Sequence, residues 1–121
     1  MGKRVRIPRE PVAVSADSVA CILPTSGTTG KPKQSMLTHN NILFSERVFT
    51  SELGRTQGDV MFMPSPLNHA TGFFHGLISP LLLGGRAVLQ QDFRPREASE
   101  LMIAEGVTWS MSATPFIYDM L

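Results

Sequence analysis

The sequence predicts an α/β fold in which strands and helices alternate and a mostly parallel sheet forms the centre. Short apolar runs of strand length are separated by longer segments whose apolar residues recur near helical spacing. The 121 residues, of which 42% are hydrophobic, are enough for one domain with a real core. No repeat, low-complexity segment or internal domain boundary interrupts the alternation.

The predicted strands are compact apolar runs bounded by polar, glycine or proline residues. They cover residues 18–23, 34–37, 59–63, 86–90 and 107–111. The first helix begins after Thr38, whose hydroxyl is a good N-cap, and ends at Gly54. Its predicted apolar face consists of Ile42, Val48, Phe49 and Leu53.

Prolines and glycines set the limits of the remaining helices. A helix over residues 71–83 is expected to kink near Pro80, which cannot donate a backbone hydrogen bond. Pro95 begins the next helix, Gly106 ends it, and Pro115 begins the last one. The apolar face of the helix after Pro95 is predicted to consist of Ala98, Leu101 and Met102.

The segment over residues 25–33 carries the strongest functional signal in the chain. Its sequence is T-S-G-T-T-G-K-P-K, so hydroxyl side chains precede two lysines and are interleaved with two glycines. Glycine lets backbone N–H groups approach an anion, hydroxyls donate to phosphate oxygens, and lysine adds positive charge. The segment therefore predicts a loop that holds nucleotide phosphates, although its spacing fits neither the Walker pattern nor the Rossmann fingerprint.

This segment closely resembles the signature T-S-G-[ST]-T-G-x-P-K of the acyl-adenylate-forming enzymes, which include acyl-CoA synthetases, luciferases and peptide-synthetase adenylation domains. In that family the loop holds the β- and γ-phosphates of ATP. Lys31 occupies the variable position and is expected in solvent. Pro24 and Gln34 depart from the residues usual beside the loop, and a glycine at position 34 would permit a positive φ. The resemblance assigns the phosphates to Thr25, Ser26, Gly27, Thr28, Thr29, Gly30 and Lys33.

Residues 64–73, P-S-P-L-N-H-A-T-G-F, resemble the family's second signature, P-[LM]-x-H-x-x-G. There the histidine lies beside the acyl pocket and the CoA tunnel, which implies this place for His69. Gly72 and Phe73 are implied candidates to bound the acyl chain. The alternatives are a core histidine at position 69 and an ordinary core face on the helix. His39 is expected to serve the entry of its helix, and no metal site built from protein side chains is expected.

The resemblance covers residues 17–121 and implies part of the large N-terminal domain of an adenylate-forming enzyme, while residues 1–16 stay unassigned. The second signature most resembles short- and medium-chain acyl-CoA synthetases and alicyclic carboxylate–CoA ligases. The implied reactants are a carboxylic acid, ATP with Mg²⁺, and CoA. Two alternatives stay open, namely an adenylating enzyme that loads a carrier protein and a truncated phosphate-binding fragment. The family's adenine, ribose and catalytic-lysine segments are absent from these 121 residues, so we expect the isolated chain to be inactive.

Composition limits the partners and the compartment. The formal net charge is +1, which does not favour binding to nucleic acid, and the cations of residues 3–9 are expected to be a solvated terminus. Cys21 is the only cysteine, so an intramolecular disulfide is impossible and a reducing cytoplasm is expected. No apolar run is long enough to span a bilayer, and the oligomeric state is left open.

Overall fold

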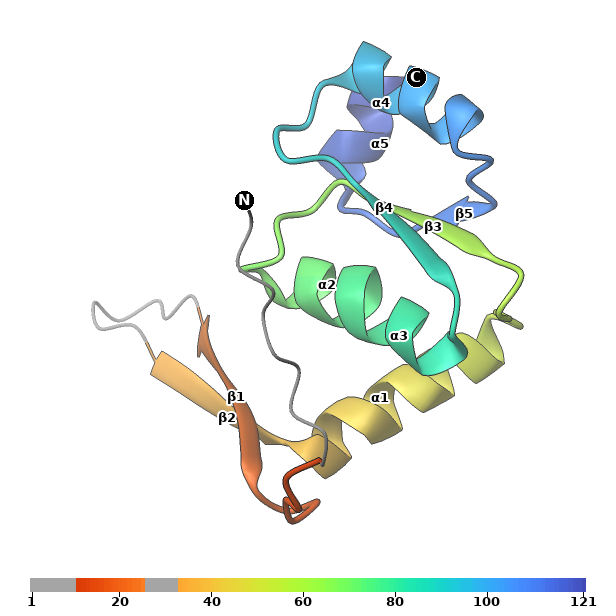
Figure 1. The fold of residues 1–121 in the computed structure, drawn as a ribbon. Helices are drawn as coiled ribbons and strands as arrows, with labels where there is room; N and C mark the ends of the chain where they lie inside the picture. Colours follow the sequence, from red (N-terminus) through yellow and green to blue (C-terminus); the bar gives the residue numbers. More distant parts are fainter. Residues whose placement is uncertain (1–10, 26–32) are drawn as a thin grey trace, which may run out of the picture.

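A three-stranded parallel sheet lies at the centre of the molecule (Figure 1). The computed structural model describes residues 11–25 and 33–121. Strand β3 (Val60–Met63) is the middle strand, with β4 (Arg86–Leu89) on one side and β5 (Trp109–Ser110) on the other. Both pairings are parallel, as the alternation of strands and helices predicts.

Helices cover both faces of this sheet (Figure 1). On one face lie α1 (His39–Glu52) and a continuous helical segment made of α2 (Ala70–Phe73), η1 (Phe74–Ile78) and α3 (Ser79–Leu83). On the other face lie α4 (Pro95–Ala104) and α5 (Thr114–Met120). The β-strand in the middle is therefore buried on both sides, and its side chains Met61, Phe62 and Met63 are each at most 1% exposed.

Phe62 is the centre of the core between the sheet and α4. It packs with Val88 of β4 and with Ala98 of α4, and both Phe62 and Ala98 have no exposed surface. Leu101 and Met102 border this cluster, so the predicted apolar face of α4 is confirmed. Fully burying a side chain of this size stabilises the fold by about 1.5–3 kcal/mol.

The first two strands form a separate antiparallel hairpin, so they do not belong to the parallel sheet. Strand β1 (Val19–Thr25) pairs with β2 (Lys33–Thr38), and Thr25 is the register partner of Lys33. Residues 26–32 lie outside the described residues. Gln34 is an exposed strand residue, and no non-glycine residue in the described part of the chain has a positive φ, so glutamine at this position carries no such strain.

Helix α1 begins and ends where its sequence predicts. The Thr38 hydroxyl accepts a hydrogen bond from the Asn41 backbone N–H at 3.2 Å, and the Asn41 side chain accepts one from the Thr38 backbone N–H at 3.0 Å. Gly54, with φ of 60°, follows the C-cap residue and ends the helix. His39 is the first residue of α1, in agreement with a role in helix entry.

The predicted buried face of α1 is wrong in part. Val48 and Leu53 are 44% and 46% exposed, whereas the buried positions are Ile42, Glu46 and Thr50. These three residues are spaced four apart, so they share one side of the helix. The apolar pattern misses this face because two of its three members are polar.

The helix predicted over residues 71–83 is present, and its irregularity is a π-helical turn rather than a simple kink. The Ser79 backbone N–H donates to the Phe74 carbonyl, five residues earlier, and Pro80 follows at once. Because proline has no N–H to donate, a regular α-helical pattern cannot continue through this point. Strand β5 is also shorter than the predicted run over residues 107–111. Within the described residues, no helix is long and apolar enough to cross a membrane.

Asp59 ties together the edge of the sheet where β3 and β5 begin. Its carboxylate accepts hydrogen bonds from the Thr56 backbone N–H at 2.7 Å and from the Thr108 hydroxyl at 2.8 Å, and Arg55 lies 3.5 Å away. The hydrogen bond from Thr56 is the largest cause that lowers the pKa of Asp59, and that from Thr108 follows. These contacts favour the ionised carboxylate over the protonated form.

We therefore predict an acid-sensitive contribution of Asp59 to stability. A pKa that is lower in the folded state stabilises the protein above the unfolded pKa of about 3.9, and the contribution is lost as the pH falls through the folded value. Urea unfolding at a series of pH values should show Asp59→Asn less stable than wild type at pH 7, with the gap closing below about pH 4. Thr108→Val keeps the carboxylate but loses one donor to it and also the acceptor of the Val60 N–H. The part of its loss that depends on pH should therefore be smaller than that of Asp59→Asn, beside a part that does not depend on pH. A gap that is constant from pH 7 to pH 2 would contradict the assignment.

Candidate functional site

After the middle strand β3 the chain passes to one face of the sheet, whereas after its two neighbours β4 and β5 it passes to the other face. After Met63 it turns toward α2, on one face of the sheet, whereas the exits of β4 and β5 lead to α4 and α5 on the other face (Figure 1). Adjacent parallel strands whose connections diverge leave crevices at their carboxyl ends, and ligands of open α/β sheets bind there. In this molecule the divergence occurs on both sides of β3.

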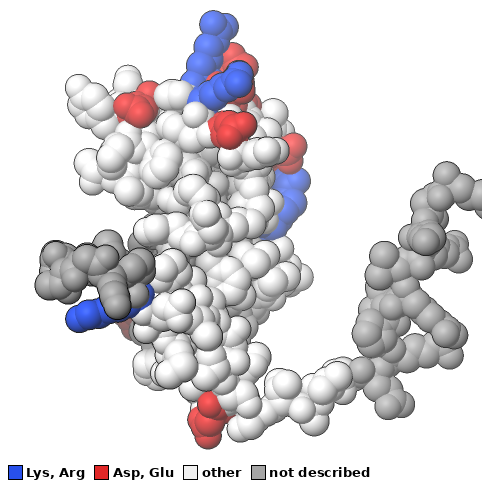
Figure 2. All heavy atoms as spheres, turned by 90° about the vertical axis from the view of Figure 1, so that its left-hand side faces the viewer, with Lys and Arg blue, Asp and Glu red and all other residues white. Residues whose placement is uncertain are grey.

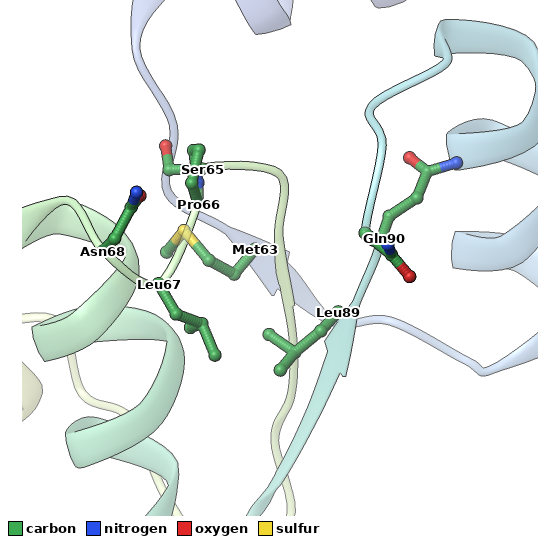
Figure 3. Close-up of a pocket in the computed structure, with 8 residues that line it drawn as sticks. Met63, Ser65, Pro66, Leu67, Asn68, Leu89 and Gln90 are labelled. Carbon is green, nitrogen blue, oxygen red and sulfur yellow. The ribbon is translucent and has the colours of Figure 1, made fainter.

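A cavity lies in each of the two crevices. The cavity between the exits of β3 and β4, here called the β4-side cavity, has a volume of about 450 Å³. Figure 3 shows Met63, Pro66 and Leu67 on one side of it and Leu89 and Gln90 on the other. Most of its wall area is apolar, although half of the lining residues carry a hydroxyl or an amide. The wall is formed by Met63, Ser65, Pro66, Leu67, Asn68, Leu89, Gln90 and Gln91.

The second cavity, here called the β5-side cavity, lies between the exits of β3 and β5 and has a volume of about 360 Å³. It shares Ser65, Pro66 and Asn68 with the first cavity, so the exit segment of β3 separates the two. The remaining wall consists of His69, Thr71, Ala113 and Phe116. The second signature of the sequence thus forms the common wall of both cavities.

His69 lies on the surface of the β5-side cavity and is exposed in these 121 residues, so within them it is not a core histidine. It is the N-cap of α2, and its Nδ1 accepts a hydrogen bond from the Thr71 backbone N–H at 3.3 Å. A ring whose Nδ1 accepts carries its proton on Nε2 when neutral. In that tautomer the His69 ring carries a hydrogen-bond donor at Nε2.

Gly72 holds the helical segment directly against the exit of β3. A Cβ atom at Gly72 would lie 2.1 Å from the Pro66 carbonyl oxygen, and one at Gly76 would lie 2.5 Å from Met63 Cγ. Only glycine permits backbone atoms to approach this closely. Gly72 thus shapes the signature loop by contact with its backbone, while Phe73 is half-buried against Phe74 and lines neither cavity.

Charged side chains are sparse over the middle of the face onto which the crevices open. In Figure 2 most of the charges on that face gather at the end of the molecule that carries α4, where Arg94 pairs with Glu97 and Arg96 with Glu100. Both cavities have uncharged walls apart from any charge on His69. This environment suits a ligand part that is mainly apolar.

The two predicted sets of site residues differ in how the structure describes them. Ser26, Gly27, Thr28, Thr29 and Gly30 lie outside the described residues, and only Thr25 and Lys33, which bracket them, have described backbone positions. His69 and Gly72 do come together with the β3 exit.

Sequence reasoning missed several residues that line the cavities, above all Gln90, Gln91 and Phe116. Their common signal is their position at the end of a predicted strand, just after it, or just inside the following helix. Residues at the carboxyl ends of neighbouring parallel strands meet at one edge of the sheet, and this rule could have selected them.

Comparison with known proteins defines the class. A model of the AMP-binding enzyme family matches residues 2–121. The chain is 48% identical to the medium-chain fatty-acid–CoA ligase of Escherichia coli over 91% of its own length and 19% of that ligase. Among solved structures it resembles the o-succinylbenzoate CoA synthetase of Bacillus subtilis in complex with AMP, with a TM-score of 0.81, 30% identity, and coverage of 86% of this chain and 21% of that one.

A further solved structure, the McyG A-PCP complexed with phenylalanyl-adenylate, has a TM-score of 0.78 and 26% identity, with 89% of this chain and 18% of that chain covered. The fold is therefore that of the N-terminal domain of adenylate-forming enzymes. The chain belongs to the AMP-binding enzyme family. It spans about a fifth of the length of the relatives that it matches.

We predict that Gly72→Ala damages the fold far more than a matched substitution in open space. The added Cβ would meet a backbone carbonyl at 2.1 Å, which a side-chain rotation cannot relieve. The free energy of unfolding should fall by about 2 kcal/mol or more. In Gly58→Ala the nearest atom would be 3.7 Å away, and the change should stay within about 0.5 kcal/mol. Denaturant unfolding of both variants tests this, and equal effects would contradict the close approach.

Proposed function

We propose that the protein carrying this chain is an ATP-dependent acyl-CoA synthetase that activates a short- to medium-chain or alicyclic carboxylic acid. The observation that carries the proposal is the pair of mostly apolar cavities on either side of the β3 exit, with the exposed His69 in the wall of one of them. Aliphatic walls fit an alkyl or alicyclic chain. The identity of 48% to a medium-chain fatty-acid–CoA ligase supports the same substrate class.

The reaction has two steps in this proposal. A carboxylate oxygen attacks the α-phosphorus of ATP and pyrophosphate leaves, which gives the acyl-adenylate. The CoA thiolate then attacks the acyl carbonyl carbon, and AMP leaves. Free carboxylate does not react with a thiol because its oxygen is a poor leaving group, and adenylation replaces it with a good one.

One group of residues serves the phosphates of ATP, and another serves the acyl group. Residues 25–33, between β1 and β2, supply backbone N–H groups, hydroxyls and the Lys33 ammonium to the β- and γ-phosphates of ATP, which binds with Mg²⁺. Donors held in place before the reaction stabilise the charge that gathers on the departing pyrophosphate. His69, through Nε2–H, donates to an oxygen of the acyl group, and Gly72 keeps the β3 exit in the shape that this requires.

A second candidate is an adenylating enzyme that transfers its acyl group to a carrier protein. Its support is the likeness to the McyG A-PCP complexed with phenylalanyl-adenylate. Both candidates share the first step and differ only in the thiol that accepts the acyl group.

Pyrophosphate exchange in the full-length protein tests the function. With ATP and labelled pyrophosphate, we expect exchange that depends on an added acid, with straight-chain acids of medium length and alicyclic acids among the active ones. Mass spectrometry after addition of CoA should then show the acyl-CoA thioester, whereas transfer only to a phosphopantetheine-bearing carrier would favour the second candidate. The isolated 121 residues serve as a control that we expect to be inactive. Absence of exchange with every acid would refute the proposal.

Substitutions at position 69 separate the cap from the chemistry. His69→Asn keeps a side-chain acceptor for the Thr71 N–H and removes the imidazole, whereas His69→Ala removes both. Both variants should raise the KM for the acid or slow the thioester step by about 10-fold or more, which corresponds to one lost hydrogen bond to a charged group. Lys33→Ala, at the phosphate end, should instead slow adenylation. If His69→Asn restored wild-type kinetics in both half-reactions, His69 would be a cap only.

A further inference from the structure

A buried polar cluster joins α1 to the helical segment that follows the β3 exit. Glu46 of α1 has no exposed surface. Its Oε2 lies 2.9 Å from His75 Nδ1 and accepts a hydrogen bond from the Ser79 hydroxyl at 2.5 Å. The His75 ring stacks on Phe49 of α1, with 4.1 Å between the ring centroids. Two turns of the segment are thus fastened to one carboxyl group.

Burying a carboxyl group costs free energy unless hydrogen bonds to polar partners replace those it made to water. Glu46 therefore depends on its two partners. Both partners here bind the same oxygen, and among the described residues Glu46 Oε1 has no hydrogen-bond partner. An apolar residue at this position would fill the space without this penalty. The carboxyl group therefore imposes a defined geometry on the contact between the two helices.

Of the two residues that contact Glu46, one lies within the π-helical turn and the other directly follows it. His75 lies inside η1, and Ser79 is the residue whose backbone N–H closes the wide turn onto Phe74. A π-helical turn accommodates one residue more than an α-helical turn, and one residue corresponds to a rotation of about 100° about the helix axis. The number of residues in this turn thus sets the rotation of α2, with its N-cap His69, relative to α3.

The same segment is in contact with the exit of β3 through its glycines. Gly76, next to His75, approaches Met63, and Gly72 approaches the Pro66 carbonyl. Shifts of the segment cannot be absorbed by side-chain movement at Gly72, because the contact is between backbones. A change at the Glu46 end is therefore transmitted to the segment of residues 64–69 that separates the two cavities.

We propose that Glu46 is a positioning residue for the acyl site, acting through Ser79 and His75 on the π-helical turn and, through it, on His69. The proposal rests on the proposed function in so far as His69 serves the acyl group. None of the three side chains of the cluster lines either cavity, so their effect on the substrate is indirect.

The test uses Glu46→Gln and Ser79→Ala in the full-length protein, with Glu52→Gln as the matched control. Glutamine keeps the shape of Glu46 and one acceptor oxygen but replaces the other oxygen by an amide NH2 group. Alanine removes the donating hydroxyl, and Glu52 is an exposed residue of the same helix. Pyrophosphate exchange is measured well below the melting temperature of each variant. Both cluster variants should raise the KM for the acid by about 10-fold or more, since misplacement by about 1 Å can cost up to 100-fold.

The KM for ATP should stay within about twofold of wild type. The residues proposed to bind the phosphates follow β1 and precede β2, and they are not part of the helices that the cluster joins. The double variant should be about as impaired as the more impaired single variant, because both substitutions act on the same contact between residues 46 and 79. A lowered melting temperature with an unchanged KM for the acid in both variants would overturn the proposal. So would equal losses for the acid and for ATP.

A second readout does not depend on activity. Histidine labelled with ¹³C at Cε1 gives a ring signal for His69, which His69→Asn identifies by its disappearance. Glu46→Gln and Ser79→Ala should move this signal, and Glu52→Gln should not. If wild type showed no exchange with any acid, the proposed function would fail while a moved His69 signal would still support the positioning role. An unmoved His69 signal in both cluster variants would overturn that role regardless of activity.

Discussion

The approach of a helix backbone to a strand exit is the constraint on which the site depends. Gly72 and Gly76 bring α2 and η1 so close to Met63 and Pro66 that no Cβ atom fits between them. This contact fixes where the chain can run after β3, and the chain after β3 forms the common wall of both cavities. The buried strand β3 supplies the rigid support, because its side chains are enclosed by helices on both faces.

Much of the fold could be predicted because its signals are local. Thr38 with Asn41 begins a helix, and Gly54 and Gly106 end helices with φ near +60°, as a left-handed C-cap requires. Each of these features involves residues a few positions apart. The parallel arrangement of β3, β4 and β5 also followed from the alternation of elements. That the hairpin of β1 and β2 stands apart from this sheet could not be predicted, because a single apolar run does not show which other strands lie beside it.

The buried face of α1 could not be predicted for a different reason. Glu46 pairs with residues 29 and 33 positions away, and a helical pattern of apolar residues cannot register such partners. A partial signal was present: His75 and Ser79 are four residues apart in a segment otherwise made of glycine, leucine, isoleucine and phenylalanine. Polar residues at helical spacing in an apolar helix indicate a polar partner across the interface. For the site, the resemblance of the second signature singled out His69 and Gly72, whereas the glutamines after β4 could be selected only from the sheet topology.

The shared wall of the two cavities has a consequence for how this scaffold can diversify. Ser65, Pro66 and Asn68 border both spaces, so a substitution there alters two pockets at once. Gln90 and Gln91 border one space and Phe116 the other, and each follows a different strand. Natural variation in ligand preference is therefore easiest to acquire at the exits of the outer strands. The segment after β3 is the part of the site where a substitution is least tolerated, because it changes both cavities together.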